Sequence, residues 1–209
     1  MITKNQFKEK YGFTLDHSFP LYATDIQELF KYNTFSKWCN QLEKQALQVT
    51  DREGYLGKGF EWFLELLFKT MPYSPHFFGI YDYQIWPSTT QDTGVDMFFK
   101  NRDGEWCVGN GKYKANNKAL LTANKDHLSN MFSTADTHPI LEGKIKPSHK
   151  IKMNNKFVFT TGEGAHLFTD FEMYHNKVTF IPYKTFKFVL DKNIGFWEKC
   201  REIAKDLEK

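Results

Sequence analysis

The chain has 209 residues, which suit one domain or a core with a small helical extension, and 17% of them are aromatic, which is ample bulk for a hydrophobic interior. No run of 18 apolar residues occurs and the N-terminus lacks the apolar stretch of a secretory signal, so neither a membrane-spanning helix nor a membrane partner is expected. The net charge of +3 is little evidence for a polyanionic partner, and three distant cysteines fit neither a zinc motif nor a disulfide framework, so we expect a reducing compartment, the cytoplasm.

The first part of the chain is predicted to be helical. Thr24 and Gln27 resemble a capping box, in which each side chain bonds the backbone of the other at the start of a helix. Apolar residues then recur at helical spacing and predict a packing helix: Phe35, Trp38, Cys39, Leu42, Ala46 and Val49. We therefore expect residues 1–56 to form a helical extension.

A second and more apolar helix is expected over Gly57–Thr70. Glu61 and Glu65 lie one turn apart on this helix. A carboxylate among so many apolar side chains needs a partner or a task. We expect a site role for Glu61, with a cap or a salt bridge to a lysine as the alternative, and the structural role for Glu65.

Strands follow this helix. Three apolar runs favour strands, over Ile80–Trp86, Val95–Phe99 and Trp106–Tyr113, and an Asp-Gly pair in segment 101–104 is a strong hairpin signal between the last two. A helix is then expected over Leu121–Phe132, strands over Lys156–Thr161 and Lys177–Ile181, and a closing amphipathic helix with Phe196, Cys200, Ile203 and Leu207 on one stripe. Through the strand at 156–161, the predicted order is α-β-β-β-α-β.

The hairpin carries the most informative polar residues. Asn110 and Lys112 are two positions apart, so they point to the same face of their strand, and antiparallel pairing can bring Asp96 beside them. A carboxylate, a second oxygen ligand and a lysine on one face can hold Mg²⁺ and a water. The alternative, a surface salt bridge between Asp96 and Lys112, is less expected because apolar strands flank both residues.

The segments Gly94-Val95-Asp96 and Asn110-Gly111-Lys112-Tyr113 resemble the PD-(D/E)xK nuclease core, in its Mrr-like restriction endonuclease branch. In that family the second segment begins with Glu or Gln, whereas Asn110 stands in this place. The resemblance covers about Gly57 to Pro182. It implies an α/β fold, with a restriction endonuclease-like core (α-β-β-β-α-β) over residues 57–209 that includes the C-terminal helix.

The resemblance also implies roles for individual residues. Asp96, Lys112, Asn110 and Glu61 would be catalytic, Glu61 because Gly57-Lys58-Gly59-Phe60-Glu61 matches a helix whose glutamate lines the metal site. A Mg²⁺ or Mn²⁺ ion would be held by Asp96, Glu61 and the carbonyl of Gly111. Asp92, four residues before Asp96, is a further candidate ligand, and a turn residue is an equally good interpretation of it.

Lysines follow the candidate site and gather in a later segment. Residues 143–156 contain five lysines and no acid. Clustered lysines supply the electrostatic part of DNA binding, and a solvated surface loop is an equally good interpretation of this segment. On the first interpretation, phosphate contacts are expected from Lys114, Lys118, Lys144, Lys146, Lys150 and Lys152, and also from Lys156.

Together these patterns predict a metal-dependent endonuclease of the restriction or mobile-element type, acting on double-stranded DNA. The alternative is a catalytically degenerate nuclease-fold module that binds DNA without cutting it, and Asp96→Ala separates the two because only an enzyme is inactivated. A third hypothesis is that Asn110 or Gly111 is an engineered replacement. Members of the resembled family also occur in front of helicase motors, so a helicase, a further domain of the same protein or a second copy in a homodimer is an expected partner.

Overall fold

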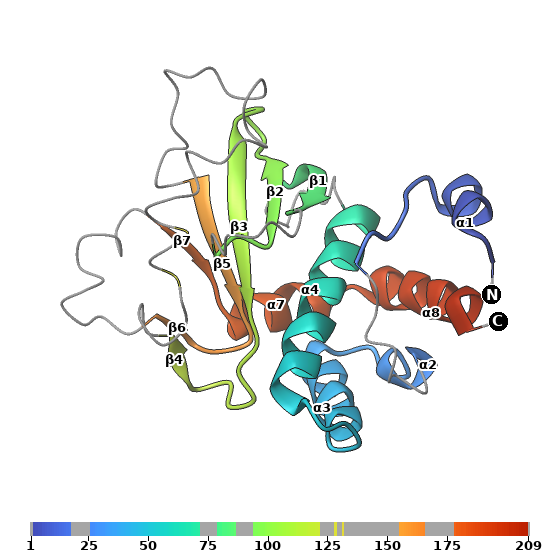
Figure 1. The fold of residues 1–209 in the computed structure, drawn as a ribbon, viewed down its shortest axis with the longest axis horizontal. Helices are drawn as coiled ribbons and strands as arrows, with labels where there is room; N and C mark the ends of the chain where they lie inside the picture. The colour runs from blue at the N-terminus through green and yellow to red at the C-terminus, as the bar shows by residue number, and fades with distance from the viewer. Residues whose placement is uncertain are drawn as a thin grey trace. The chain divides into compact units, whose positions relative to one another are not determined.

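The computed structural model describes residues 2–17, 26–71, 79–86, 94–121, 128, 131, 155–165 and 178–208. This described part of the chain is mixed α/β, with six helices and a mixed sheet of five strands (Figure 1). The chain falls into two compact units: unit 1 comprises Met1–Pro72 and Lys184–Lys209, and unit 2 comprises Tyr73–Tyr183. The boundary expected between residues 56 and 57 lies inside a helix of unit 1, and the closing helix also belongs to unit 1.

Unit 1 is helical in its described residues. Three of its helices begin at a side-chain cap, where Thr3, Thr34 or Asp51 accepts a hydrogen bond from the main-chain N–H three residues further on. The helices are α1 (Lys4–Tyr11), α2 (Ile26–Leu29), α3 (Phe35–Ala46), α4 (Arg52–Thr70), α7 (Tyr183–Leu190) and α8 (Ile194–Glu208).

The helix predictions are largely confirmed. Five residues of the expected stripe on α3 are buried, whereas Val49 lies beyond the end of that helix. Helix α4 begins at Arg52, five residues before the predicted start, because Asp51 caps it. Thr24, the first half of the expected capping box, lies outside the described residues, and Gln27 lies in α2.

Aromatic side chains join the two chain segments of unit 1 into one core. Phe35 of α3 lies against Phe186 of α7, with ring centroids 5.1 Å apart. Phe63 of α4 contacts both Trp38 and Trp197, at centroid distances of 4.1 and 6.3 Å. All five side chains are fully buried, and each contributes roughly 2 kcal/mol or more of transfer free energy. The helices on either side of unit 2 in the sequence therefore depend on each other.

A second connection in unit 1 joins α1 to α8. The ammonium of Lys10 and the hydroxyl of Tyr11 both donate to Asp206 Oδ2, each at 2.7 Å. Burial, and then the hydrogen bond with Asp206, raises the pKa of Tyr11 to about 12. Tyr11 therefore stays a neutral hydrogen-bond donor throughout the physiological pH range.

Unit 2 is built on the five-stranded sheet, in the order β1-β2-β3-β5-β7. The first three strands are antiparallel neighbours, and β3, β5 and β7 run parallel. Every strand predicted from the sequence is present, with its ends within two residues of the expected positions. The strands are β1 (Tyr81–Ile85), β2 (Met97–Lys100), β3 (Trp106–Lys112), β5 (Lys156–Thr160) and β7 (Thr179–Ile181), with a separate small sheet of β4 (Leu120–Leu121) and β6 (Gly164–Ala165).

The hairpin turn between β2 and β3 is confirmed. The Asn101 N–H donates to the Glu105 carbonyl at 3.0 Å, and the Asn101 side-chain oxygen accepts from the N–H groups of Asp103 and Glu105. Gly104 has φ +75°, a conformation that glycine adopts without a steric penalty. This turn fixes the register in which Met97 lies opposite Gly109.

The helix expected over 121–132 is only partly supported. Leu121 is not helical, because it is buried in β4, where it pairs with Ala165 of β6. Leu128 and Met131 are helical and fully buried, and the residues between and beyond them lie outside the described part of the chain. Both belong to the hydrophobic cluster of this unit, which also contains Trp86, Val95, Phe98, Val108, Leu121, Val158 and Val178.

Candidate functional site

The candidate polar residues Asn110 and Lys112 lie at the C-terminal end of strand β3. Trp106 and Val108 both contact the hydrophobic cluster of unit 2, so alternation places Asn110 and Lys112 on that same face. Gly109 and Gly111 then face the other way. The predicted common face of Asn110 and Lys112 is therefore present.

Asp96 is fixed between two strands just before β2 begins. Its N–H donates to the Gly109 carbonyl at 2.9 Å, and its own carbonyl accepts from the N–H of Trp86 at 2.8 Å. Its carboxylate accepts a hydrogen bond from the N–H of Gly111, with 2.7 Å between Oδ2 and N. The structure thus brings the Asp96 carboxylate to the Asn110–Gly111 peptide, as expected from the sequence.

Two glycines allow this close approach. Gly94 has φ +65°, in the left-handed region that disfavours other residues, and it turns the chain into Val95 and Asp96. At Gly109 an added Cβ would lie 2.9 Å from Met97 Cγ and 3.0 Å from Phe159 Cε2. A side chain at position 109 would therefore push β3 away from its neighbours.

Asn110 is buried, with 1% of its surface exposed. Its side-chain nitrogen donates to the Gly94 carbonyl at 2.6 Å. Its side-chain oxygen is also buried and has no hydrogen-bond partner among the described residues. Leaving a buried amide oxygen unpaired costs about 1 to 3 kcal/mol, so a cation or water that paired with it would be stabilised.

Lys112 ends β3 and is half-buried. Its carbonyl accepts a hydrogen bond from the N–H of Thr161 at 3.2 Å, which holds its backbone against the chain that follows β5. Within the described ranges, no hydrogen bond or ion pair of the Lys112 ammonium is found. The predicted approach of this ammonium to the Asp96 carboxylate stays a prediction.

The candidate DNA-contacting lysines have different outcomes. Lys114 is half-buried, with both its N–H and its carbonyl bonded to the Thr161 hydroxyl, whereas Lys118 is exposed in the following turn. Lys156 is completely buried, which corrects the expectation that it contacts a phosphate, because it pairs opposite Val108 inside the sheet. Asp92 and the lysines at 144, 146, 150 and 152 lie outside the described residues.

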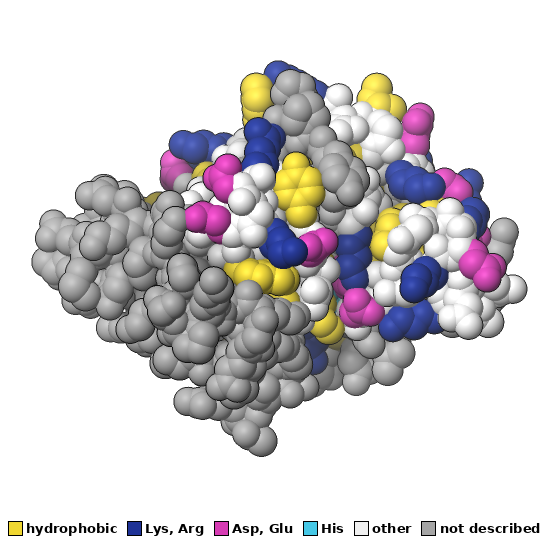
Figure 2. Space-filling view, turned by 90° about the horizontal axis from the view of Figure 1, so that it is seen from above, with side chains coloured by type: hydrophobic (Ala, Val, Ile, Leu, Met, Phe, Trp, Pro, Cys, Tyr) yellow, Lys and Arg dark blue, Asp and Glu magenta, His cyan; other side chains and the backbone are white. Residues whose placement is uncertain are grey.

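Charge on the surface shown in Figure 2 is mixed. Lysine and arginine side chains lie there among acidic ones, without a continuous basic area over the described residues. The described residues of this face therefore form no basic patch of the kind that DNA binding uses.

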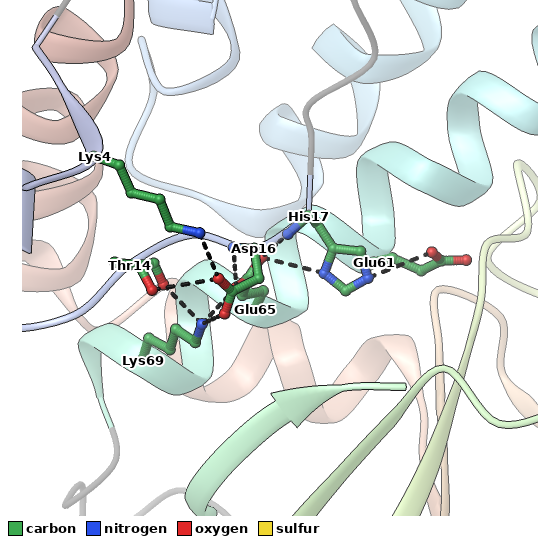
Figure 3. A network of polar contacts seen from close by, with 7 residues as sticks. All are labelled: Lys4, Thr14, Asp16, His17, Glu61, Glu65 and Lys69. Carbon is green, nitrogen blue, oxygen red and sulfur yellow. Dashed lines mark hydrogen bonds and ion pairs between the residues drawn. The ribbon is translucent and has the colours of Figure 1, made fainter. Parts of the chain in front are cut away.

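Glu61 and Glu65, both on α4, belong to a polar network of unit 1 (Figure 3). The Glu65 side chain is fully buried and accepts from the main-chain N–H of Asp16 at 2.7 Å, from that of His17 at 2.8 Å and from Lys69 Nζ at 2.6 Å. Its Oε2 also lies 3.2 Å from His17 Nδ1. Glu65 therefore fastens the segment around His17 to α4, which is the structural role expected for it.

The other members extend this network. Lys69 also donates to the Thr14 carbonyl at 2.7 Å and to Asp16 Oδ2 at 2.8 Å. His17 Nε2 lies 3.7 Å from Glu61 Oε2, so the side chain of Glu61 has a histidine as its neighbour. Since Glu61 lies in unit 1 and Asp96 in unit 2, its predicted role beside Asp96 stays a prediction.

The network keeps Glu65 ionised. Burial by itself raises the pKa of Glu65, but the hydrogen bonds from His17 and Lys69 and the charge of Lys69 outweigh burial and lower that pKa. The i, i+4 spacing of Glu65 and Lys69 is visible in the sequence. The contacts with Asp16 and His17 span 49 and 48 residues and follow no local pattern, so sequence reasoning missed them.

The described residues offer few metal ligands. Across the described ranges, no group of three or more His, Cys, Asp or Glu residues is arranged to hold a metal ion. The oxygen donors at the candidate site are Asp96 and the side-chain oxygen of Asn110, which is unpaired within the described ranges. None of the described helices is long and apolar enough to cross a membrane.

Comparison with protein-family models, with curated proteins and with solved structures found no match for this chain.

Proposed function

We propose that the chain is a metal-dependent deoxyribonuclease of the PD-(D/E)xK type, which hydrolyses phosphodiester bonds of double-stranded DNA. The observation that carries this proposal is the hydrogen bond of 2.7 Å between the Asp96 carboxylate and the Gly111 amide nitrogen. Gly111 is the residue directly before Lys112, so the carboxylate is held beside the peptide that leads to the candidate lysine. The strand arrangement supports it, because an antiparallel β1-β2-β3 meander is followed by parallel β5 in the order expected for that core. A cytoplasmic location and a restriction or mobile-element role are part of this proposal.

The residues at the site fit Mg²⁺ or Mn²⁺ by donor type. Both ions prefer oxygen ligands, which Asp96 and the buried Asn110 oxygen, unpaired within the described part of the chain, supply. When bound, such an ion polarises a phosphate oxygen and lowers the pKa of a bound water. The Gly111 carbonyl, Glu61 and Asp92 are the further proposed ligands. With one charged ligand among the residues that meet at Asp96, weak binding of Mg²⁺ is expected.

The side chains of the chain would divide the remaining work. Asp96 is already held by the Gly111 N–H, so its carboxylate needs little reorganisation to act as a ligand. Lys112 would orient the attacking water and offset the negative charge that develops on the phosphate. Asn110 keeps β3 fastened to Gly94 and aligns both groups. Lys114 and Lys118 would contact the DNA backbone on either side.

The test is cleavage of plasmid DNA in Mg²⁺ and in Mn²⁺ by the full chain and three variants. Asp96→Asn can still accept the Gly111 N–H but removes the charge, and Lys112→Gln removes the ammonium. Asp103→Asn removes an exposed acid from the turn of the same hairpin and serves as the control. Cleavage by the wild type and Asp103→Asn, with none by the other two, is expected. Equal nicking by all four proteins would refute the catalytic proposal.

A second candidate function is a nuclease-fold module that binds DNA without cutting it. The specific observation in its favour is Asn110, a neutral residue whose amide nitrogen is committed to the Gly94 carbonyl. In this case the wild type and Asp96→Asn would bind duplex DNA equally, and neither would cut it in either metal. Such a module would act beside a helicase, a further domain of the same protein or a second copy of the chain.

A further inference from the structure

Unit 1 has a basic surface that the proposed nuclease site does not use. We call residues 31–37 and 184–192 the α3/α7 surface. These two stretches contain five lysines and one acid, Asp191, which gives them a net charge of +4 against +3 for the whole chain. All five lysines are exposed: Lys31, Lys37, Lys184, Lys187 and Lys192. One of them, Lys31, also forms an ion pair at 3.4 Å with Glu28, an acid just outside these stretches.

The same surface exposes two aromatic rings. Phe188 of α7 is 66% exposed, although phenylalanine is a residue usually buried, and Lys192 Nζ lies 3.9 Å from its ring centroid. Tyr32 is 36% exposed, and Lys37 Nζ lies 4.5 Å from its ring centroid. Each ring therefore has a cation within the range of a cation–π contact.

One hydrogen bond joins the two stretches. The Phe35 N–H at the start of α3 donates to Asp191 Oδ1 at 2.8 Å, and Asp191 also pairs with Lys187. The only acid of the surface is therefore engaged inside it. Tyr32 lies three residues before Phe35 in the sequence, and Phe188 lies three residues before Asp191, so the hydrogen bond joins the segments that carry the two rings. The buried contact of Phe35 with Phe186 joins the same two segments.

We infer that the α3/α7 surface binds single-stranded DNA. Lysines neutralise phosphates, and exposed aromatic rings stack on unpaired bases, which together are the recurring chemistry of single-strand binding. A duplex hides the faces of its bases, so Phe188 and Tyr32 favour a single strand over the double-stranded substrate of the proposed nuclease. The choice of DNA rather than RNA rests on the proposed function. The expectation that the surface binds a single strand rests instead on its exposed lysines and aromatic rings.

The test measures binding of the full chain to a fluorescently labelled oligothymidylate of about 20 nucleotides, long enough for several stacking and phosphate contacts. Phe188→Ala should weaken binding about tenfold, the effect of losing one stacked base. Leu47→Ala is the matched control, because Leu47 is an equally exposed apolar residue, 68% against 66%, at the end of α3. Both substituted side chains are exposed, and circular dichroism checks that both variants keep the wild-type fold.

The lysines are tested through salt. Lys184→Gln and Lys192→Gln should each reduce the slope of log K against log salt by about 0.7 on a single strand. Lys205→Gln, an exposed lysine of α8 outside the surface, should bind with the same affinity as the wild type. Asp96→Asn should also bind as the wild type does, so loss of nuclease activity and loss of strand binding are distinguishable.

Several outcomes would overturn the inference. Equal binding of the oligonucleotide by Phe188→Ala and the wild type would do so, as would a preference of the wild type for duplex DNA or for an oligouridylate of the same length. Phe188→Ala could instead convert a dimer into a monomer in sedimentation without changing strand binding, which would make the surface a contact between copies. Binding to anionic vesicles with none to the oligonucleotide would assign the surface to a lipid.

Discussion

Asn110 is fastened to Gly94 by a hydrogen bond of 2.6 Å from its side-chain amide to the main-chain carbonyl. This hydrogen bond joins β3, the strand that contains Lys112, to the turn at Gly94, which lies two residues before Asp96. The oxygen of the same amide is buried and, among the described residues, has no hydrogen-bond partner. The amide nitrogen of Asn110 thus holds the backbone of the site together, and its amide oxygen is a candidate metal ligand. Position 110 is therefore the best place to test the metal proposal.

Asn110→Glu should destabilise the metal-free protein by about 1 to 3 kcal/mol, because the Gly94 carbonyl loses its donor and a carboxylate is buried. Mn²⁺ or Mg²⁺ should restore stability, since the added charge strengthens a metal site. The measurement is the unfolding temperature with and without metal. Asn110→Leu, which loses the same hydrogen bond without adding a charge, should be destabilised and show no recovery. An unfolding temperature of Asn110→Glu that neither Mg²⁺ nor Mn²⁺ raises would contradict the proposed metal site.

Asp96→Ala should lower the free energy of unfolding by about 1.5 to 3 kcal/mol, the contribution of a hydrogen bond to a charged group. Asp96→Asn should lower it less, because its amide oxygen can still accept from the Gly111 N–H. Urea unfolding of both variants beside the wild type checks this difference. Equal stability of the two variants would mean that the Gly111 hydrogen bond contributes little.

Glu65→Gln should destabilise unit 1 by about 3 kcal/mol at pH 7, because it removes the charge that balances the largely buried Lys69. Its pKa in the folded protein lies below the unfolded value of about 4.3, so the stabilisation is fully present above that value. It is lost as the pH falls through the folded-state pKa.

Urea unfolding at pH 7 and at pH 3 measures this effect. The wild type should lose more stability than Glu65→Gln over that interval. Glu9→Gln, an exposed acid of α1, should behave as the wild type does. If Glu65→Gln loses as much stability as the wild type on acidification, Glu65 is not the group responsible.

Gly109→Ala should destabilise unit 2 by about 1 to 3 kcal/mol, because the new methyl group would contact Met97 and Phe159 at under 3.1 Å. Gly57→Ala is the matched control: its Cβ would meet nothing within 4 Å, and alanine favours a helix by roughly 0.5 to 1 kcal/mol. Thermal unfolding should move in opposite directions for the two variants. A shift in the same direction would contradict the packing argument at position 109.

Much of unit 2 could be predicted because its signals are local. The turn between β2 and β3 needs a glycine at Gly104 and an Asn side chain at Asn101, both present in four residues of sequence. Alternation around Val108 then fixes which face carries Asn110. The strand position of Leu121 was missed because its pairing with Ala165 joins residues far apart in the sequence.

The candidate site was predictable to the same extent. Asp96 and Gly111 are 15 residues apart and joined by one tight turn, so their contact follows from the hairpin. The buried state of Lys156 could not be foreseen, because a lysine run in the sequence favours an exposed loop. The Glu65 network brings together residues 48 apart through an irregular segment, for which no periodic pattern exists.

The division of unit 1 between two distant chain segments has a consequence for the order of folding during synthesis. Unit 2 is continuous in sequence, so all of its segments leave the ribosome before the last part of unit 1 is made. Unit 1 must wait, because Phe35 finds Phe186 and Lys10 finds Asp206 only after nearly the whole chain has been made. During that interval its aromatic residues stay uncovered, so a chaperone that shields the N-terminal helices should raise the yield of the folded protein.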